Sequence, residues 1–229
     1  MPTAIVLGAT GAIGQQLVTQ LARRDEVESV IVITRRELDL TREFPNAIVS
    51  KIQPALLDFE QLEAQAAECM PAGAVAFVAF GTTKKQAGSK EAFRRVDYGL
   101  VLAFARACKA AGVSRLGVVT AHGANAHSKI FYNQVKGEVE QDIQALGLPC
   151  VFFVRPSLLL GRPDDGRLAE KWASALLAPA AHVLPRSVRP IEVSRVAAAM
   201  MNAALGGASE KASFVLTNAQ MHQREPAKH

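Results

Sequence analysis

The start of the chain constrains its fold most, because a short apolar run there ends in three evenly spaced glycines. Ala4–Leu7 is apolar, Gly8, Gly11 and Gly14 follow it, and the residues after Gly14 are apolar with a helical period. This order predicts a buried parallel strand, a tight turn and then a helix.

The same turn is suited to holding the phosphates of a nucleotide. Glycines allow the main chain to approach a pyrophosphate, and the N-terminus of the next helix offers free N–H groups and the positive end of its dipole. The spacing Gly8-x-x-Gly11-x-x-Gly14 differs from the usual G-x-G-x-x-G pattern, and an ordinary strand–helix turn is the alternative. The residues expected to bind the nucleotide here are Gly8, Thr10, Gly11, Ala12, Ile13 and Gly14.

Strand and helix patterns alternate along the chain. Strands are expected at Ala4–Leu7, Ser29–Thr34, Ile48–Ile52, Val75–Phe80, Arg115–Thr120, Cys150–Arg155 and Phe214–Leu216. Helices are expected at Ala12–Arg23, Phe59–Ala67, Lys90–Ala111, Phe131–Leu146, Leu168–Leu177 and Ser194–Leu205. This alternation predicts an α/β fold, with a mainly parallel sheet and helices on both faces.

The length of 229 residues fits one doubly wound domain of this kind, which we expect to occupy residues 1–219. The segment Gly161–Arg189 is rich in Pro and Arg, and we expect it to pass over the end of the sheet and cover a substrate. Residues 220–229 have no apolar period and no turn residues, so we expect a loose tail there.

Composition argues against several classes of protein. The net charge is +5 at pH 7, but the basic residues are scattered and aromatic residues make up only 6%, so a nucleic-acid partner is not expected. No apolar stretch reaches the roughly 18 residues of a membrane span, and no signal peptide is expected before the first strand. The three cysteines are far apart, and His122 and His127 lack further metal ligands nearby. We therefore expect a cytoplasmic protein with no metal, nucleic-acid or membrane partner.

The ends of the second and fourth strands indicate the kind of nucleotide. Arg35 and Arg36 follow the second strand, where an NAD site would carry a carboxylate, so NADP(H) is favoured over NAD(H). The alternative is that both arginines belong to a surface loop, face the solvent and bind no ligand. Asp58 precedes a helix and could cap it, accept a hydrogen bond from the adenine, or do both. The small residues expected to lie close to a ribose after the fourth strand are Gly81, Thr82 and Thr83.

Tyr132 and Lys136 stand four residues apart in a segment with a helical pattern, so both side chains lie on one helix face. A cation about 4 Å from a phenol stabilises the phenolate by roughly 1 kcal/mol in water and roughly 4 kcal/mol at an effective dielectric near 20. A phenol stabilised in this way can exchange a proton near neutral pH, as a general acid–base must. Most Tyr and Lys residues at this spacing are only neighbours on a helix. The pair indicates a catalytic site here because the same chain carries the glycine turn of a nucleotide site.

Three further segments carry a resemblance to a known family. They are Phe80-Gly81-Thr82-Thr83, Arg95-Val96-Asp97-Tyr98 and Gln134-Val135-Lys136-Gly137-Glu138-Val139-Glu140. Together with the glycine turn and the Tyr-x-x-x-Lys pair, in this order, they resemble the atypical branch of the short-chain dehydrogenase/reductase superfamily, and within it the Tat-interacting-protein-like oxidoreductases. The resemblance implies a Rossmann-type domain with the strand order 3-2-1-4-5-6-7.

The resemblance also implies roles for single residues. Tyr132 would exchange a proton with a carbonyl or an alcohol, while Lys136 would hold the nicotinamide ribose and make Tyr132 more acidic. The residues that would pass along the nicotinamide are Arg155, Pro156 and Ser157. In this family the helices corresponding to 90–111 and 131–146 often pack against a second subunit, which would give a homodimer; burial against the sheet is the alternative.

Two residues depart from the family pattern. Ala121 stands where the family usually carries a serine that binds the substrate oxygen, so Thr120 or His122 would have to supply that hydrogen bond. Asp97 stands where many relatives have an asparagine, which would alter a water site that relays protons.

The expected function is that of an NADP(H)-dependent oxidoreductase acting on a small carbonyl or alcohol, with Tyr132, Lys136 and Thr120 in the catalytic site. A protein that binds NADP(H) for regulation or to engage a partner, with little or no turnover, is the alternative that Ala121 and Asp97 motivate. Epimerisation on a bound cofactor is a third reading. No motif identifies the substrate.

Overall fold

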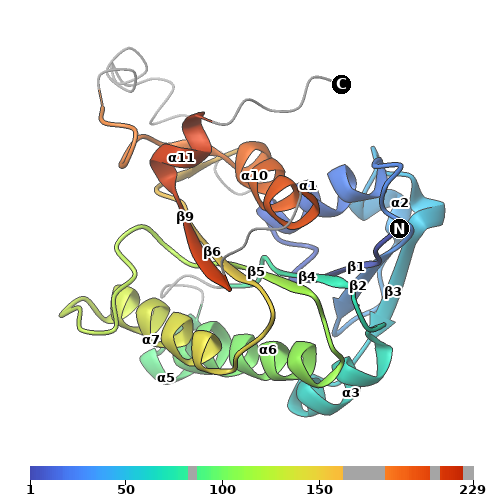
Figure 1. Cartoon of the computed structure of the whole chain (residues 1–229), viewed down its shortest axis with the longest axis horizontal. Helices are drawn as coiled ribbons and strands as arrows, with labels where there is room; N and C mark the ends of the chain where they lie inside the picture. The colour runs from blue at the N-terminus through green and yellow to red at the C-terminus, as the bar shows by residue number, and fades with distance from the viewer. Residues whose placement is uncertain (82–86, 162–183, 207–211, 224–229) are drawn as a thin grey trace.

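The computed structural model describes residues 1–81, 87–161, 184–206 and 212–223, which form one α/β domain (Figure 1). In these residues one sheet contains seven strands in the order β3-β2-β1-β4-β5-β6-β9. The strands are β1 (Ala4–Leu7), β2 (Val30–Thr34), β3 (Ile52–Leu56), β4 (Val75–Val78), β5 (Arg115–Val119), β6 (Val151–Arg155) and β9 (Ser213–Thr217). Each neighbouring pair is parallel. The predicted fold class and strand order are confirmed, with β9 as the seventh strand.

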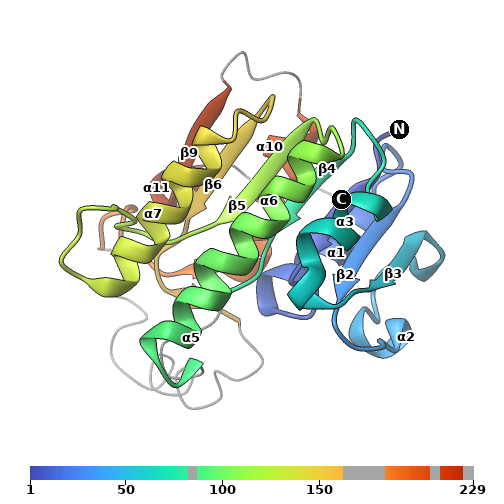
Figure 2. The same ribbon diagram turned by 90° about the horizontal axis from the view of Figure 1, so that it is seen from below.

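Helices cover both faces of the sheet (Figures 1 and 2). One face carries α1 (Ala12–Ala22), α2 (Leu40–Glu43), α10 (Val193–Leu205) and α11 (Asn218–Gln223), and the other carries α3 (Leu62–Cys69), α5 (Lys90–Arg94), α6 (Val101–Ala110) and α7 (Phe131–Ala145). Successive strand residues point to opposite faces. Val6 therefore packs in the core with α1 and α10, whereas Ile5 and Leu7 pack in the core with α6 and α7. Burial on both faces explains why β1, β2 and β4 are apolar without alternation.

The helix predicted at 90–111 is present, but its middle has a different geometry. Ser89 caps the start of α5, since its hydroxyl oxygen accepts a hydrogen bond from the N–H of Ala92 at 3.0 Å. Arg95–Leu100 form a π-helical turn, η3, and α6 continues from there. A π turn holds more residues than an α turn, so it changes the direction in which its side chains point. Asp97 lies in this turn and is buried.

The third strand lies later in the chain than predicted. The expected strand Ile48–Ile52 is replaced by β3, and Val49–Lys51 form a 3-10 turn, η1. Pro54 has no N–H and therefore weakens the sequence pattern of a strand at this place. In the structure Pro54 lies opposite Val32 in the outermost strand, where a missing donor is tolerated.

The C-terminal segment also differs from prediction. The expected loose tail at 220–229 begins in α11 instead, where Met221 is fully buried. Two short strands, β7 (Leu159–Leu160) and β8 (Ile191–Glu192), pair with each other and bring together the two ends of the predicted excursion. Most of that excursion, including the helix predicted at 168–177, lies outside the described residues, as do Thr82 and Thr83.

Candidate functional site

The glycine turn after β1 is tightly packed. Gly8 has a φ of 89°, and a β-carbon there would lie 2.7 Å from backbone atoms of Ala79 and Phe80. A β-carbon on Gly14 would lie 2.0 Å from the carbonyl oxygen of Gly8. Gly11 is the N-cap of α1, and no side chain caps the helix there. The first N–H groups of α1 are therefore not satisfied by a capping side chain.

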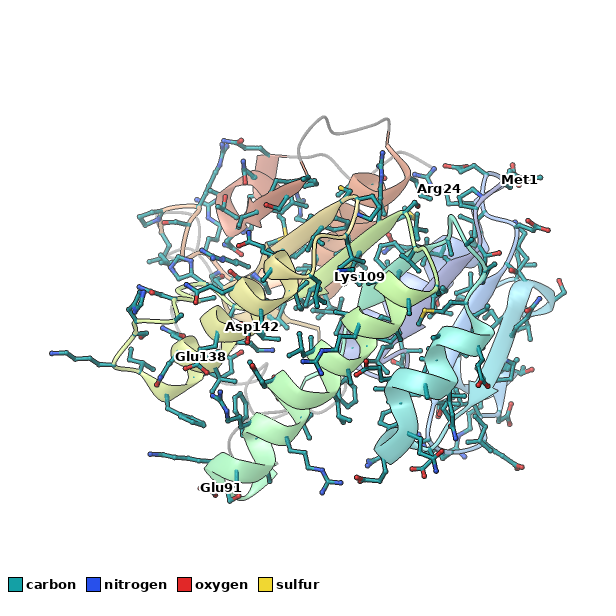
Figure 3. All side chains as sticks on the ribbon, turned by 60° about the horizontal axis from the view of Figure 1, so that its bottom comes forward. Met1, Arg24, Glu91, Lys109, Glu138 and Asp142 are labelled. Atoms are coloured by element: carbon teal, nitrogen blue, oxygen red, sulfur yellow. The ribbon has the colours of Figure 1, made fainter. Side chains whose placement is uncertain are left out.

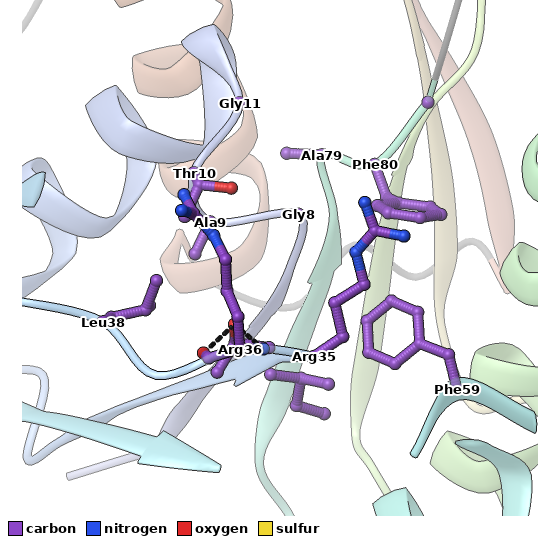
Figure 4. Close-up of a pocket in the computed structure, with 13 residues that line it drawn as sticks. Gly8, Ala9, Thr10, Gly11, Arg35, Arg36, Leu38, Phe59, Ala79 and Phe80 are labelled. Atoms are coloured by element: carbon purple, nitrogen blue, oxygen red, sulfur yellow. Dashed lines mark hydrogen bonds between the residues drawn. The ribbon is translucent and has the colours of Figure 1, made fainter. Parts of the chain in front are cut away.

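A cavity of about 350 Å³ opens beside this turn, at the carboxyl ends of β1, β2 and β4 (Figure 4). Its lining residues are Gly8, Ala9, Thr10, Gly11, Ile33, Thr34, Arg35, Arg36, Leu38, Phe59, Ala79, Phe80 and Gly81. The chain order of the strands reverses between β1 and β4, which is where ligands bind in open parallel sheets. The predicted cofactor residues that line the cavity are Gly8, Thr10, Gly11, Arg35, Arg36 and Gly81. Three more, Ala12, Ile13 and Gly14, belong to the first turn of α1 behind it.

Two arginines give this cavity a positive lining. Arg35 extends toward Phe59 and Phe80, whereas Arg36 extends toward the glycine turn (Figure 4). Atom Nη2 of Arg36 also lies 3.3 Å from Oε1 of Glu43. The lining residues that the structure describes include no Asp or Glu. A lining that carries two arginines and no carboxylate of its own fits a ligand with phosphate groups, although Glu43 outside the lining already pairs with Arg36.

Asp58 does not line the cavity, but its neighbour does. Oδ1 of Asp58 accepts a hydrogen bond from the N–H of Glu60 at 2.9 Å, so Asp58 caps the 3-10 turn η2 (Phe59–Gln61). The ring of Phe59 forms part of the cavity wall and meets the ring of Phe80 edge-on, with 5.9 Å between centroids. The structure thus supports the capping role of Asp58, and it adds an aromatic wall that the sequence pattern did not reveal.

Lys136 lies at the end of the cavity marked by Gly81. Its Nζ atom is 2.7 Å from Oδ1 of Asp97, and both side chains are almost completely buried. A β-carbon on Gly81 would stand 3.1 Å from Oδ1 of Asp97 and 3.6 Å from Nζ of Lys136. The absence of a side chain at residue 81 therefore leaves room directly above the ion pair.

Tyr132 lies one helical turn before Lys136, on the side of α7 that faces α5. Its ring packs against Phe93 with centroids 5.6 Å apart, and the residue is 37% exposed. Phe93 and Asp97 have the same four-residue spacing as Tyr132 and Lys136. Phe93 therefore contacts Tyr132, and Asp97 contacts Lys136 one turn further along. Between the described side chains of Tyr132 and Lys136 there is no hydrogen bond. The structure brings them to the same helix face without joining them.

Thr120 and Arg155 converge on Glu140, a buried residue of α7. The hydroxyl of Thr120 donates to Oε1 of Glu140 at 2.6 Å. The Nε atom of Arg155 donates to the same oxygen at 3.0 Å, and its Nη2 donates to Oε2. The hydrogen bond to Glu140 raises the pKa of Arg155. Sequence reasoning assigned Thr120 and Arg155 to substrate and cofactor, but it gave no role to Glu140, which holds both.

The loop after β6 is fixed to the rest of the domain by Asn218. The N–H of Ser157 donates to Oδ1 of Asn218 at 3.0 Å, and the Ser157 hydroxyl donates to the carbonyl of Arg189 at 2.6 Å. The carbonyl of Pro156 accepts a hydrogen bond from the N–H of His122 at 2.9 Å. Asn218 is buried, and its role had no signal in the sequence. These contacts hold Pro156 and Ser157 in place at the carboxyl end of the sheet.

In the described parts of the chain, no helix combines the length and apolar character that crossing a bilayer demands. Those parts also contain no group of three or more His, Cys, Asp and Glu side chains that could hold a metal ion. The three cysteines are free thiols.

Comparison with known proteins agrees with this geometry. Residues 8–203 match the model of a family described as NAD(P)H-binding. Protein FMP52-1, mitochondrial, from Scheffersomyces stipitis is 37% identical over 168 residues, which cover 72% of this chain and 70% of that protein. Among solved structures, MoeE5 in complex with UDP-glucose and NAD has a TM-score of 0.69 at 18% identity, covering 93% of this chain and 75% of the other. ElxO with NADP bound has a TM-score of 0.69 at 12% identity, covering 97% and 99%. At these identities the two structures show a shared fold alone.

The relatives correct one expectation and establish the family. Several of them, from different fungi, are named as mitochondrial proteins, which contradicts the cytoplasmic location expected from the sequence. That expectation was a default based on an apparent lack of targeting signals, and such a default is weak. The family match spans most of the residues from the glycine turn to the end of α10. The chain therefore belongs to the NAD(P)H-binding family.

Proposed function

We propose that the protein is an NADP(H)-dependent oxidoreductase of the short-chain dehydrogenase/reductase type, acting on a small carbonyl or alcohol. The observation that carries the proposal is the cavity at the β1/β4 reversal, which has a glycine turn on one side, two arginines on another and Lys136 near its far end. A ligand with phosphates at one end and a ribose at the other matches this distribution of donors. Membership of the Tat-interacting-protein-like branch stays a prediction.

The chain offers separate groups to each part of such a cofactor. Gly8 and Gly11 would allow the backbone to approach the pyrophosphate, and Arg35 and Arg36 would bind a 2′-phosphate, which supports NADP(H) over NAD(H). Lys136 would donate hydrogen bonds to the nicotinamide ribose. When bound, the nicotinamide supplies a hydride donor or acceptor.

Tyr132 is the residue that we propose for proton exchange with the substrate oxygen. Tyr132 is partly exposed and lies one helical turn from the buried Lys136, which leaves Tyr132 open to a substrate. Asp97 balances the charge of Lys136, so the ammonium stabilises a phenolate less than the sequence alone suggests. Thr120 is less suited to holding the substrate oxygen, because its hydroxyl is buried and already donates to Glu140.

A comparison of the two tyrosines of the chain tests this proposal. Tyr132→Phe should retain NADPH affinity and lose about 100-fold or more of the turnover on a responsive carbonyl, as expected for removal of a general acid. Tyr98→Phe is the matched control, since Tyr98 donates to Asp142 away from the cavity and its loss should leave turnover nearly unchanged. NADPH consumption over a panel of aldehydes and ketones gives the measurement. Full turnover in Tyr132→Phe would exclude the role of Tyr132.

A second candidate function is NADP(H) binding without turnover. It is favoured by Ala121, which is buried and has no hydroxyl, and by the engagement of Thr120 with Glu140. Calorimetry that detects NADPH binding, combined with no consumption on any member of the panel, would favour this candidate.

A further inference from the structure

Two rows of contacts join α7 to the helix that α5 and η3 form. The first row pairs Phe93 with Tyr132 and Asp97 with Lys136, and the second pairs Arg94 with Glu138 and Tyr98 with Asp142. Glu138 and Asp142 lie on the side of α7 that faces α5 and α6 (Figure 3). The first row ends beside the cavity at Gly81, whereas the second is nearer the solvent.

The carboxylates of α7 are all committed to partners other than Lys136. Glu138 pairs with Arg94, and Asp142 accepts a hydrogen bond from the hydroxyl of Tyr98. Glu140 is held by Arg155 and Thr120. Arg95, the residue of η3 that carries a positive charge, pairs instead with Glu60 on the surface. Among the described residues, Asp97 is the carboxylate that lies within ion-pair distance of Lys136.

The π turn explains how Asp97 reaches Lys136. Asp97 lies at the third position of η3 and is almost completely buried, in a helix whose surface residues include Arg94 and Arg95. A π turn widens the helix locally, and such turns are often found at functional sites because they redirect one side chain. The π turn thus directs the carboxylate of Asp97 into the interior, in a segment that would otherwise be one continuous α-helix.

For a buried lysine, a partner of opposite charge determines how readily the amine stays protonated. A buried amine without an opposite charge loses its proton more readily, because desolvation disfavours the charged form. A lysine ammonium has three N–H donors, and the ion pair with Asp97 occupies one direction. The remaining donors can serve hydroxyl groups of a ligand placed over Gly81, where no side chain intervenes.

We infer that Asp97 is a positioning residue, which favours the ammonium form of the buried Lys136 and directs it toward Gly81, where it would meet the cofactor ribose. This inference rests on the proposed function, because it assigns the ribose to Lys136. Asp97 acts through Lys136 and does not itself react.

Calorimetry of NADPH binding across a pH series tests the inference. In the wild type, affinity should change little between about pH 6 and about pH 9, apart from effects shared by all variants. In Asp97→Asn, affinity should fall by about tenfold as the pH rises, because the unbalanced amine of Lys136 loses its proton and with it a charged hydrogen bond. The double variant Asp97→Asn with Lys136→Met should lose this added pH dependence and bind weakly throughout.

Asp142→Asn is the matched control, because it removes another acid from the same helix interface without touching Lys136. Its pH profile should follow the wild type. If the pH profile of Asp97→Asn also follows the wild type, the inference is overturned. It is overturned as well if Asp97→Asn and Asp142→Asn change the pH dependence of NADPH affinity equally, since that would indicate loosened packing alone.

A second measurement separates this inference from the proposed function. Nuclear magnetic resonance of side-chain-labelled lysine in the protein without nucleotide reports the pH at which the Lys136 amine loses its proton, with Lys136→Met giving the assignment. This midpoint should be lower in Asp97→Asn than in the wild type, and an unchanged midpoint overturns the inference. Absence of NADPH binding to the wild type would instead overturn the proposed function, and with it the assignment of the ribose to Lys136.

Discussion

The carbonyl oxygen of Gly8 lies 2.0 Å from the point where a β-carbon on residue 14 would stand. Gly14→Ala therefore forces the strand–helix turn apart, and we expect it to lower the free energy of unfolding by about 2 kcal/mol, as overpacking of a rigid site does. Thermal unfolding measures this loss. Nucleotide binding should weaken as well, because the turn shifts as a unit.

Gly11→Ala provides the contrasting prediction, since a β-carbon there would be 3.4 Å from the Gly8 oxygen and 3.6 Å from the Ala79 oxygen. These are ordinary contact distances, so stability should remain close to that of the wild type. The new methyl group would stand in the cavity lining, and NADPH affinity should fall by about tenfold. Unchanged affinity would show that the pyrophosphate does not use this turn.

Arg35 and Arg36 are expected to select the phosphorylated cofactor. Each single change to Ala should weaken NADPH binding by roughly tenfold and leave NADH binding nearly unchanged, because a hydrogen bond to a charged group contributes about 1.5 to 3 kcal/mol. Calorimetry with both nucleotides gives the ratio. Arg42→Ala, an exposed change in α2 outside the cavity lining, serves as the control. Equal losses for NADH and NADPH would contradict a role in selection.

Glu140 is expected to be a major contributor to stability. Glu140→Ala leaves Arg155 and Thr120 without their common partner, and removing one member of a buried pair costs about 3 kcal/mol. The Arg155 side chain is 31% exposed, so water limits the loss to the lower part of the usual range. Urea unfolding measures the change. The more exposed ion pair of Glu138 gives the control, since Glu138→Gln should cost less than about 1 kcal/mol.

His222 is expected to make the C-terminal helix sensitive to acid. Burial lowers the pKa of His222 below its usual 6.5. The hydrogen bond to the Arg189 carbonyl raises this pKa by less, and the charges of Arg195, Arg189 and Arg186 each lower it by a smaller amount. The unfolded chain then binds more protons just below pH 6.5 than the folded chain does. This contribution to stability is present above that pH and is lost as the pH falls toward the folded pKa.

His222→Gln should therefore flatten the acid side of the stability profile. Thermal unfolding of both proteins at a series of pH values provides the measurement. Identical slopes below pH 6.5 would show that His222 has no part in the acid sensitivity.

The sequence predicted the fold well because strand and helix periods are local. The strand from Ala4, the glycine turn and the helix after it appear where expected, and the order of the sheet follows from alternation of elements. Prediction failed for β3 because the true strand contains Pro54 and therefore does not have the usual pattern of a strand, so the apolar residues of Ile48–Ile52 were favoured instead. It also failed for the π turn, because Lys90–Ala111 has the composition of one continuous helix.

The site was harder to predict because its key contacts join distant elements. Arg35 and Arg36 could be placed from the end of a strand, and the structure puts both at the cavity. The pairing of Lys136 with Asp97, and of Glu140 with Arg155, depends on how α7 packs on its neighbours. No spacing along the chain encodes such packing. The homodimer and the catalytic roles of Tyr132 and Lys136 stay predictions.

The proline in the outermost strand has a consequence beyond the register of the sheet. An exposed strand edge can recruit a strand from another molecule and so begin aggregation. Pro54 cannot donate a hydrogen bond, and the short strand β3 has few N–H groups to offer in its place. This side of the molecule is therefore a poor template for pairing with a strand of another molecule.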